Sequence, residues 1–224
     1  MAELALIDAP SVTWRVERAT SALRFSRIDV IDASGSTGNR FDVPGAGILY
    51  TATTKTGAFA ETLARFRPTS SLIEKMRKIE GVDDTDQHEE PGGVDESWFD
   101  LRRLRAVQMV DPLPFVDVDD PRTHTYLARH ASRELMGVGV GTLDVATIRG
   151  PDRRVTRAVA SWLYARTNDD GTPQFSGLRY GSRLGAYECW AIFDGTAVQE
   201  ISQERISDQP ELRHVMDTFG LARS

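Results

Sequence analysis

A glycine-rich segment directly before a strand-like stretch is the feature that most restricts how this chain can fold. The segment covers residues 35–47 and contains four glycines and one proline. This composition opposes regular secondary structure and lets the backbone approach a ligand closely. Residues 48–52, which follow, have the composition of a buried strand, and Thr53 or Thr54 is placed to cap a helix. We therefore expect a bent loop that leads into a strand and then a helix.

The rest of the pattern predicts a single mixed α+β domain over residues 1–224. With 224 residues, 40% of them hydrophobic, the chain can bury one substantial core but hardly two. Helices are expected near 54–65, 70–79, 121–135 and from Pro151 onward, and strands near 25–31, 48–52, 104–110, 115–118, 177–180, 187–193 and 197–201. The predicted fold is a mixed β-sheet core flanked by helices. The acidic stretch 81–97 has no helical stripe and is predicted to be a surface insertion.

The helix that Pro151 opens has a clear apolar face. This face consists of Val155, Val159, Trp162 and Leu163. The arginines of the helix lie off that face, at Arg153, Arg154 and Arg157. We interpret them as a solvated surface, with contact to an acidic partner as the alternative.

Charge and cysteine content limit the classes of function. The chain has 27 basic and 33 acidic residues, a formal charge of -6, which argues against direct nucleic-acid binding or a grip on an anionic membrane. Its one cysteine, Cys189, cannot form an intramolecular disulfide and is interpreted as a small buried hydrophobe, so a cytoplasmic location is expected. Neither a signal peptide nor an apolar stretch of ~20 residues is recognisable. The four histidines are scattered and no CxxC is present, so no metal site is expected.

Three polar side chains follow one another in the loop, the strand and the helix. Arg40 lies in the loop, Tyr50 near the end of the strand, and Glu61 on the helix. Side chains in these positions can converge at the carboxyl end of a strand, where open sheets leave a crevice. The residues alone do not favour a particular ligand.

These positions belong to a set of motifs that resembles the RES-domain family, whose members often act as toxins in toxin–antitoxin pairs. The resemblance rests on residues 14–16, 38–41, 47–52, 58–61, 177–183 and 189–193. It implies a mixed α/β fold related to ADP-ribosyltransferases. It also implies that Arg40, Tyr50 and Glu61 line a pocket for NAD, with Ser182 as the family's serine. The loop departs from the family at Asn39, commonly glycine, and at Phe41, commonly tryptophan.

The chemistry of NAD cleavage fits these residue types. Arginine carries a permanent charge and a planar fork suited to phosphate oxygens, and tyrosine offers a flat ring with one hydroxyl. Loss of nicotinamide leaves positive charge on the ribose, which a fixed carboxylate such as Glu61 would stabilise. Arg15 and Arg183 are further candidates for binding the nucleotide.

Each of these residues also has an ordinary interpretation. Arg40 could be a solvated loop arginine, and Tyr50 a core residue with a satisfied hydroxyl. Glu61 lies opposite the apolar stripe of its helix and could simply be exposed. Ser182 could be a turn former, and Arg15 could form a salt bridge at a strand end.

The leading hypothesis is a toxin-like enzyme for which NAD is a substrate, not a cofactor, and which passes ADP-ribose to water or inorganic phosphate. A protein ADP-ribosyltransferase that uses NAD is the first alternative. A non-catalytic nucleotide- or partner-binding module is the second. The resemblance further implies an antitoxin with a helix-turn-helix (Xre-like) that blocks the site. Formation of a homo-oligomer is left open.

Overall fold

A nine-stranded mixed sheet forms the centre of the molecule. The computed structural model describes residues 3–21, 23–32, 35, 37–79 and 92–224. Eight strands follow the order β1-β7-β8-β9-β4-β2-β6-β10, and β3 pairs with β4. Only β7 and β8 pair in parallel within this sheet, as far as the described residues go. The nine strands of this sheet are Leu6–Ile7 (β1), Thr13–Arg18 (β2), Ser26–Arg27 (β3), Gly47–Ala52 (β4), Arg102–Met109 (β6), Phe115–Asp117 (β7), Gly177–Gly181 (β8), Glu188–Phe193 (β9) and Val198–Arg205 (β10).

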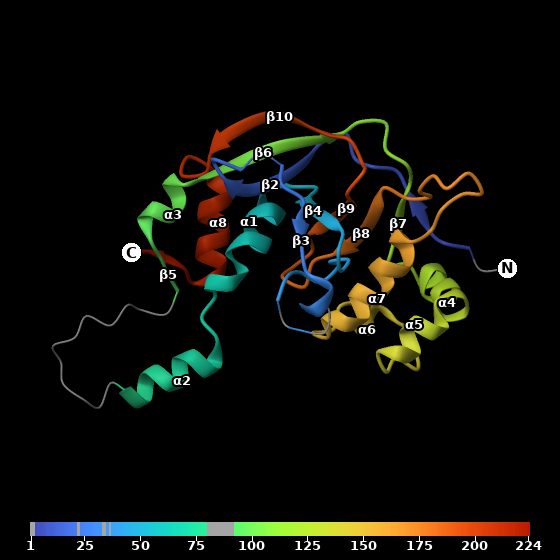
Figure 1. The fold of residues 1–224 in the computed structure, drawn as a ribbon. Helices are drawn as coiled ribbons and strands as arrows, with labels where there is room; N and C mark the ends of the chain where they lie inside the picture. Colours follow the sequence, from blue (N-terminus) through green and yellow to red (C-terminus); the bar gives the residue numbers. More distant parts are fainter. Residues whose placement is uncertain (1–2, 22, 33–34, 36, 80–91) are drawn as a thin grey trace.

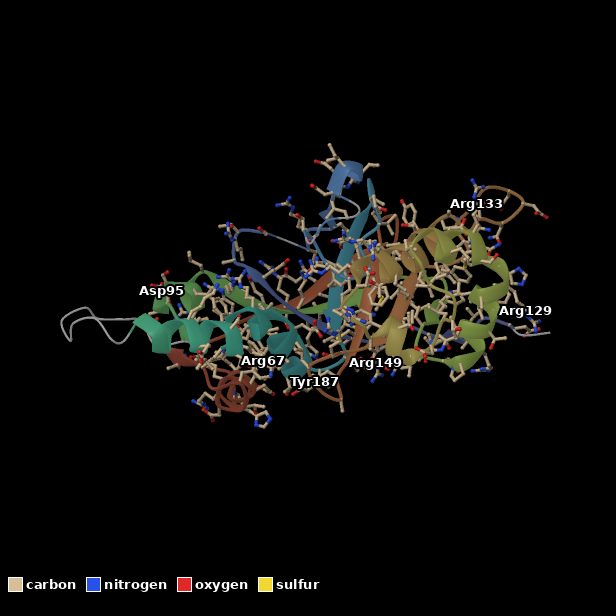
Figure 2. All side chains as sticks on the ribbon, turned by 90° about the horizontal axis from the view of Figure 1, so that it is seen from below. Arg67, Asp95, Arg129, Arg133, Arg149 and Tyr187 are labelled. Carbon is tan, nitrogen blue, oxygen red and sulfur yellow. The ribbon has the colours of Figure 1, made fainter. Side chains whose placement is uncertain are left out.

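Most of the helices lie on one side of this sheet (Figure 1). They are α1 (Lys55–Leu63), α2 (Ser70–Ile79), α3 (Glu96–Asp100), α4 (Pro121–His130), α5 (Ser132–Gly137), α6 (Val145–Ile148), α7 (Arg153–Tyr164) and α8 (Pro210–Phe219), with short 3-10 turns at Val30–Asp32 and Ala64–Phe66. A second, parallel sheet joins β5 (Gly93–Val94) to β11 (Ala222–Arg223). The chain is thus a single compact α/β domain, as the sequence predicted. Seen from the helical side, Asp95 and Arg129 lie toward opposite ends of it (Figure 2).

The core is divided by the sheet because neighbouring strand residues point to opposite faces. Ile48 of β4 joins the larger cluster under the helices, which includes Phe41, Phe59 and Leu163. Leu49, the next residue, joins a smaller cluster on the other face. Helix α1 sits tightly on the sheet: a Cβ at Gly57 would come within 3.1 Å of the Ala52 side chain. Because Gly57 and Ala52 are so close, the first turn of α1 packs against the end of β4.

The predicted elements are largely present, and the departures have local causes. The expected strand over 25–31 is short, because residues after Arg27 turn into the 3-10 helix. The expected helix over 121–135 is two helices, broken at Ala131. The break presents the carbonyl of His130, which accepts a 3.1 Å hydrogen bond from the Trp162 indole.

The C-terminal helix α8 was not predicted, although the sequence carries its boundaries. Pro210 occupies its first turn, and Gly220 ends it with a φ of 64°, the left-handed conformation that favours glycine. Of the predicted insertion at 81–97, residues 81–91 lie outside the described residues. Residues 93–97 form β5 and the start of α3.

Candidate active site

A cavity of about 840 Å³ opens beside the ends of β2 and β4, between α1 and the start of α7. In Figure 1 these two helices lie on the same side of the sheet, on either side of β3 and the glycine-rich loop. Five of the six predicted site residues line this one cavity: Arg15, Arg40, Tyr50, Glu61 and Arg183. The sixth, Ser182, lies one hydrogen bond behind Glu61. The structure therefore brings together residues from five separate segments of the chain.

Arg40 is held at the cavity by backbone and by two aromatic rings. Its Nη2 donates a 2.7 Å hydrogen bond to the Ile148 carbonyl. The guanidinium carbon lies 5.1 Å from the Phe41 ring centroid and 5.5 Å from that of Tyr180, within the range of cation–π attraction. Burial lowers the pKa of Arg40 from its usual value. The guanidinium is thus partly desolvated, and its buried Nε has no hydrogen-bond partner among the described residues.

The loop that carries Arg40 is fixed by helix α7. Arg157 is only 3% exposed and donates hydrogen bonds to the backbone carbonyls of Asp32, Gly35, Thr37 and Asn39. Arg153 donates to the carbonyl of Gly38. The Thr156 hydroxyl donates to the carbonyl of Arg40 itself. Our interpretation of the α7 arginines as a solvated face is therefore wrong for Arg157, because this side chain replaces the hydrogen bonds that an irregular loop cannot make within itself.

Tyr50 is oriented by an aspartate that the sequence did not single out. Its hydroxyl donates a 2.8 Å hydrogen bond to Oδ1 of Asp42, and the other oxygen of Asp42 accepts from the backbone nitrogen of Asn39. Burial and the Asp42 carboxylate raise the pKa of Tyr50 well above its usual value. The phenol therefore stays protonated at neutral pH. This one carboxylate therefore ties the middle of the bent loop to β4.

Glu61 is exposed, as its position on α1 predicted, but it is exposed to the cavity. Its Oε1 accepts a 2.6 Å hydrogen bond from the Ser182 hydroxyl. The Sγ of Cys189 lies 3.8 Å from the same oxygen. Burial, and then the nearby Glu61 carboxylate, raise the pKa of Cys189, so the thiol is neutral and acts as a weak donor. Ser182 in turn accepts a 2.9 Å hydrogen bond from the Leu184 nitrogen, which fixes its direction.

Arg15 borders the cavity and also forms the salt bridge considered as its alternative role, while nucleotide binding by Arg15 stays a prediction. It lines the cavity, and its Nε forms a 3.0 Å ion pair with Glu17. Its Nη1 also donates a 2.7 Å hydrogen bond to the Tyr50 carbonyl. The side chain is therefore anchored on the strand pair β2–β4 while one face of it borders the cavity.

The cavity wall is strongly basic. Six arginines line it, and Glu61 is the one acidic side chain among its described lining residues. Sequence reasoning missed three of these arginines, at positions 65, 67 and 153, and two aromatic lining residues, at positions 14 and 180. Trp14 and Tyr180 belong to the family motifs, but the sequence analysis gave them no role. Nothing in the sequence distinguishes Arg65 or Arg67 from other exposed arginines, because both follow α1 in an irregular turn.

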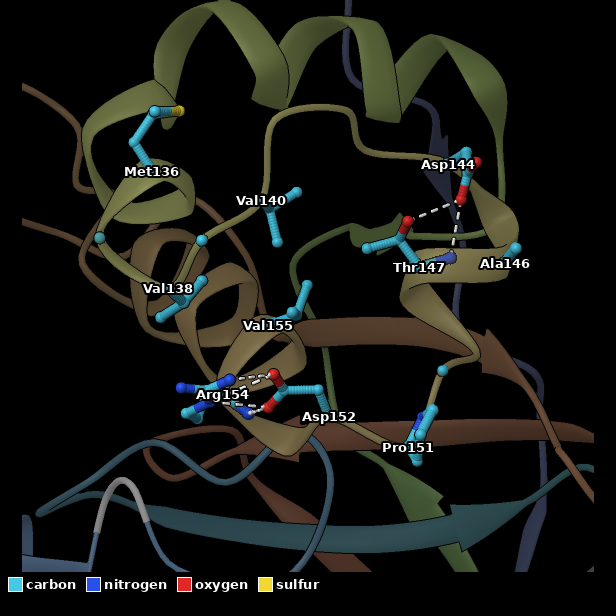
Figure 3. A pocket seen from close by; sticks show the side chains of 13 residues that line it. Met136, Val138, Val140, Asp144, Ala146, Thr147, Pro151, Asp152, Arg154 and Val155 are labelled. Carbon is cyan, nitrogen blue, oxygen red and sulfur yellow. Dashed lines mark hydrogen bonds and ion pairs between the residues drawn. The ribbon is translucent and has the colours of Figure 1, made fainter.

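A second hollow of about 810 Å³ lies away from these residues, between α5, α6 and α7. Figure 3 shows valines facing it and the ion pair of Asp152 with Arg154 at its edge, with nitrogen and oxygen 2.6 Å apart. Its polar side chains are paired with one another. It therefore offers no comparable set of groups for catalysis.

Two features of the described residues bear on metal binding and on membrane insertion. Within the described part of the chain, no group of three or more histidine, cysteine, aspartate or glutamate side chains is arranged to hold a metal ion. None of the described helices combines the length and apolar character needed to cross a bilayer.

The fold and the cavity define an α/β protein with an arginine-rich pocket that contains a hydrogen-bonded carboxylate. The sequence matches the RES domain family over residues 12–214, so the chain belongs to that family. Its structure is similar to a chain in the crystal structure of the M. tuberculosis MbcT–MbcA toxin–antitoxin complex, with 13% sequence identity and a TM-score of 0.47 over 96% of this chain and 91% of that one. No curated protein matches the sequence.

Proposed function

We propose that this protein cleaves the nicotinamide–ribose bond of NAD and passes ADP-ribose to water or inorganic phosphate. The observation that carries the proposal is the composition of the cavity: six arginines surround a single acidic side chain among the described lining residues. The two phosphates of NAD need positive charge, whereas the reacting ribose needs a negative group. At about 840 Å³ the cavity is within the usual size range of ligand sites.

The reaction needs little proton transfer at its first step. The C1′–N bond of the ribose breaks, its electron pair stays on the nicotinamide nitrogen, and the pyridinium leaves as a neutral ring. The ribose becomes oxocarbenium-like, and the carboxylate of Glu61 stabilises that charge. Water or phosphate then forms a bond to C1′, and the acceptor oxygen gives up its proton if it carries one.

The surrounding groups have complementary roles in this proposal. Arg40, with Arg15 and Arg183, binds the phosphate oxygens. The rings of Tyr50 and Tyr180 provide flat surfaces for the nicotinamide or ribose. Ser182 keeps Glu61 in one rotamer through its 2.6 Å hydrogen bond. A relation to the ADP-ribosyltransferase fold would place this chemistry in a known structural context.

Membership of the RES domain family supports a biological role for this activity. We propose that the protein is the toxin of a toxin–antitoxin pair and acts in the cytoplasm by depleting NAD. Its partner would be an antitoxin that carries a helix-turn-helix and covers the cavity. Co-purification with the product of the adjacent gene, together with loss of nicotinamide release in the complex, tests this part of the proposal.

The test of the activity uses purified protein and NAD, with and without inorganic phosphate, and measures nicotinamide release. Release that leaves free ADP-ribose, or ADP-ribose with a phosphate on that same C1′, supports the proposal. Label transferred from NAD to a protein would instead identify an ADP-ribosyltransferase. Nucleotide binding without release, with Glu61→Gln behaving as wild type, would identify a non-catalytic module. We expect Glu61→Gln to lower turnover by about 100-fold or more while nucleotide binding is retained.

A further inference from the structure

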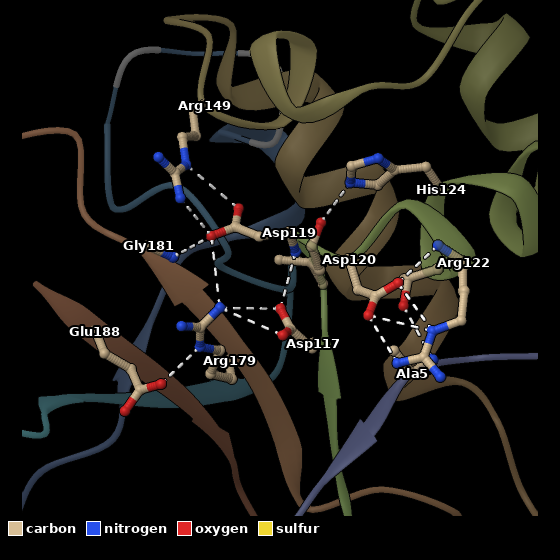
Figure 4. Close-up of polar contacts among 12 residues, drawn as sticks. Ala5, Asp117, Asp119, Asp120, Arg122, His124, Arg149, Arg179, Gly181 and Glu188 are labelled. Carbon is tan, nitrogen blue, oxygen red and sulfur yellow. Dashed lines mark hydrogen bonds and ion pairs between the residues drawn. The ribbon is translucent and has the colours of Figure 1, made fainter. Parts of the chain in front are cut away.

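A cluster of charged side chains lies at the ends of β7 and β8 (Figure 4). Its central group is the Asp119 carboxylate, whose side chain is 9% exposed. Oδ2 of Asp119 accepts a 2.6 Å hydrogen bond from the Gly181 nitrogen and a 2.8 Å hydrogen bond from Arg149. No member of this trio lines the cavity.

Each of the two partners of Asp119 is next in sequence to a residue that anchors a side chain of the proposed active site. Arg149 directly follows Ile148, whose carbonyl accepts the 2.7 Å hydrogen bond from Arg40. Gly181 directly precedes Ser182, whose hydroxyl donates the 2.6 Å hydrogen bond to Glu61. The Asp119 carboxylate therefore connects the residue that anchors Arg40 to the residue that anchors Glu61. Each partner of Asp119 is directly bonded in the chain to one of these anchoring residues.

The connection is closely packed at Gly181. A Cβ at this position would lie 2.4 Å from Nη2 of Arg149 and 2.7 Å from Oδ2 of Asp119. The glycine thus allows the guanidinium and carboxylate to approach the backbone of the β8 end. Close packing at Gly181, in addition to the ion pair, keeps the end of β8 at a fixed distance from Asp119 and Arg149.

Arg179 pairs with carboxylates of the surrounding strands and also with Asp119. It forms ion pairs with Asp117 at 3.2 Å and Glu188 at 2.8 Å, and its distance to Asp119 is 3.8 Å. Replacement of Arg149 therefore leaves the strand-to-strand ion pairs in place. The effect of that replacement should fall on the loop that carries Ile148.

We propose that Asp119 and Arg149 are positioning residues that set the separation between Arg40 and Glu61. The proposal rests on the proposed function, since it assigns to the pair a role in aligning phosphate binding with stabilisation of the ribose cation. Displacement of about 1 Å at a reacting centre can lower a rate by as much as about 100-fold. Transition-state stabilisation should be lost more than ground-state binding, because both binding groups remain present but are misaligned.

The experiment compares Arg149→Gln and Asp119→Asn with matched controls that remove a neighbouring, exposed ion pair. Arg122→Gln and Asp120→Asn are these controls, because Arg122 and Asp120 form a pair with nitrogen and oxygen 2.8 Å apart outside the cavity lining. We expect Arg149→Gln and Asp119→Asn to lower kcat by about 10- to 100-fold. Their Kd for ADP-ribose should change by less than about threefold, and Arg149→Lys should recover part of the activity. Both controls should keep wild-type kcat.

A second measurement separates this inference from the proposed function. Amide hydrogen exchange should become faster in residues 182–187 and 37–42 of Arg149→Gln, and not in those of Arg122→Gln. If wild type releases no nicotinamide, the proposed function is wrong, and unchanged exchange in both segments would still overturn the positioning role. If wild type is active and Arg149→Gln keeps its kcat, the positioning role is wrong while the activity stands. Arg149 is 46% exposed, so its replacement is not expected to prevent folding.

Discussion

At the scale of single residues, the Ser182 hydroxyl has two hydrogen bonds to satisfy. It donates to Glu61 and accepts from the Leu184 nitrogen, at 2.6 and 2.9 Å. Ser182→Ala frees the carboxylate and leaves a backbone donor without its partner. We expect a stability loss of about 1–2 kcal/mol and a decrease in turnover of about tenfold, because Glu61 then samples several rotamers.

Urea unfolding and nicotinamide release measure these two effects. Ser97→Ala is the matched control, since the Ser97 hydroxyl also donates to a carboxylate, that of Asp95, at an exposed site outside the cavity lining. This control should keep full activity. Equal loss of activity in the two variants would contradict the role of Ser182.

Tyr50 makes the stability of the protein depend on pH in the alkaline range. Burial, followed by the Asp42 carboxylate, raises the pKa of the folded-state phenol well above its usual value. The unfolded phenol ionises near pH 10. The stabilisation from Tyr50 is therefore fully present below about pH 10 and is lost as pH rises toward the folded-state pKa.

The comparison of wild type with Tyr50→Phe isolates this contribution, because phenylalanine cannot ionise. The difference in unfolding free energy, wild type minus variant, should be constant below about pH 10 and decrease as the pH rises above about 10. Denaturant titrations across this range measure it. Parallel pH curves for the two proteins would show that the Tyr50 phenol has the same pKa in both states.

Site residues that belong to a sequence motif were predictable. Residues that reach the site only through the three-dimensional path of the chain were not. Arg40, Tyr50 and Glu61 were predicted to share a pocket, and all three line one cavity. Their catalytic roles stay predictions. Asp42 was not predicted, because an aspartate in a glycine-rich loop is an ordinary turn residue. Its bond to Tyr50 depends on a loop path that sequence alone does not define.

At the scale of elements, helix α7 stabilises the glycine-rich loop that it packs against. The buried Arg157 donates to three carbonyl oxygens of the loop and to that of Asp32 before it. The glutamine side chain of Arg157→Gln is too short to reach these carbonyls, so several backbone acceptors lose a charged donor. We expect a loss of about 2–3 kcal/mol in unfolding free energy and weaker nucleotide binding, because the backbone of Arg40 belongs to the same loop.

Arg154→Gln is the control within the same helix, since Arg154 is exposed and paired with Asp152. Its unfolding free energy should stay within about 0.5 kcal/mol of wild type. Denaturant unfolding compares the stabilities, and ADP-ribose titration compares binding. If Arg157→Gln also stays within that limit, the loop is held by other contacts.

Element boundaries were predictable where caps and periodicity agree. Thr54 caps α1 as expected, accepting a hydrogen bond from the Gly57 nitrogen. The periodicity from 121 to 135 predicted one helix, yet the chain bends at Ala131 so that α5 packs against α7. Such a bend is decided by tertiary packing, which local patterns do not contain. The burial of Arg157 escaped prediction for the same reason, because its partners are about 120 residues earlier in the chain.

At the scale of the whole molecule, the sheet order explains how distant segments meet. Strand β4 lies between β9 and β2, so residues near 15, 50 and 189 become neighbours. The β8–β9 connection then brings Ser182 to Glu61, in the second half of α1. The sequence predicted a mixed sheet flanked by helices, but it did not contain the order of the strands. The sequence therefore predicted which residues form the site, but not how these residues are arranged in space.

The charge distribution gives a prediction that distinguishes the effect of the cavity charges on anion binding from the effect of the net charge of the whole chain. The chain has a formal charge of -6, whereas the described wall of the cavity has six arginines and one glutamate. If net charge governed binding, added salt would screen repulsion and strengthen the binding of an anion. If the cavity governs, salt should weaken binding, because it screens the attraction to the arginines.

The cavity should dominate, because the arginines that line it are the charges nearest to a phosphate bound there. Exposed charges farther away than the Debye length, about 8 Å at 0.15 M salt, are largely screened. ADP-ribose is a suitable probe because it carries the two phosphates without the positive ring. Its Kd should rise by about tenfold between about 0.05 and 0.5 M NaCl, measured by calorimetry. In Arg40→Gln the same increase in salt should raise Kd by a smaller factor, because one of the attracting charges is gone. A Kd that falls with salt would mean that the arginines of the cavity do not face the phosphates of the ligand.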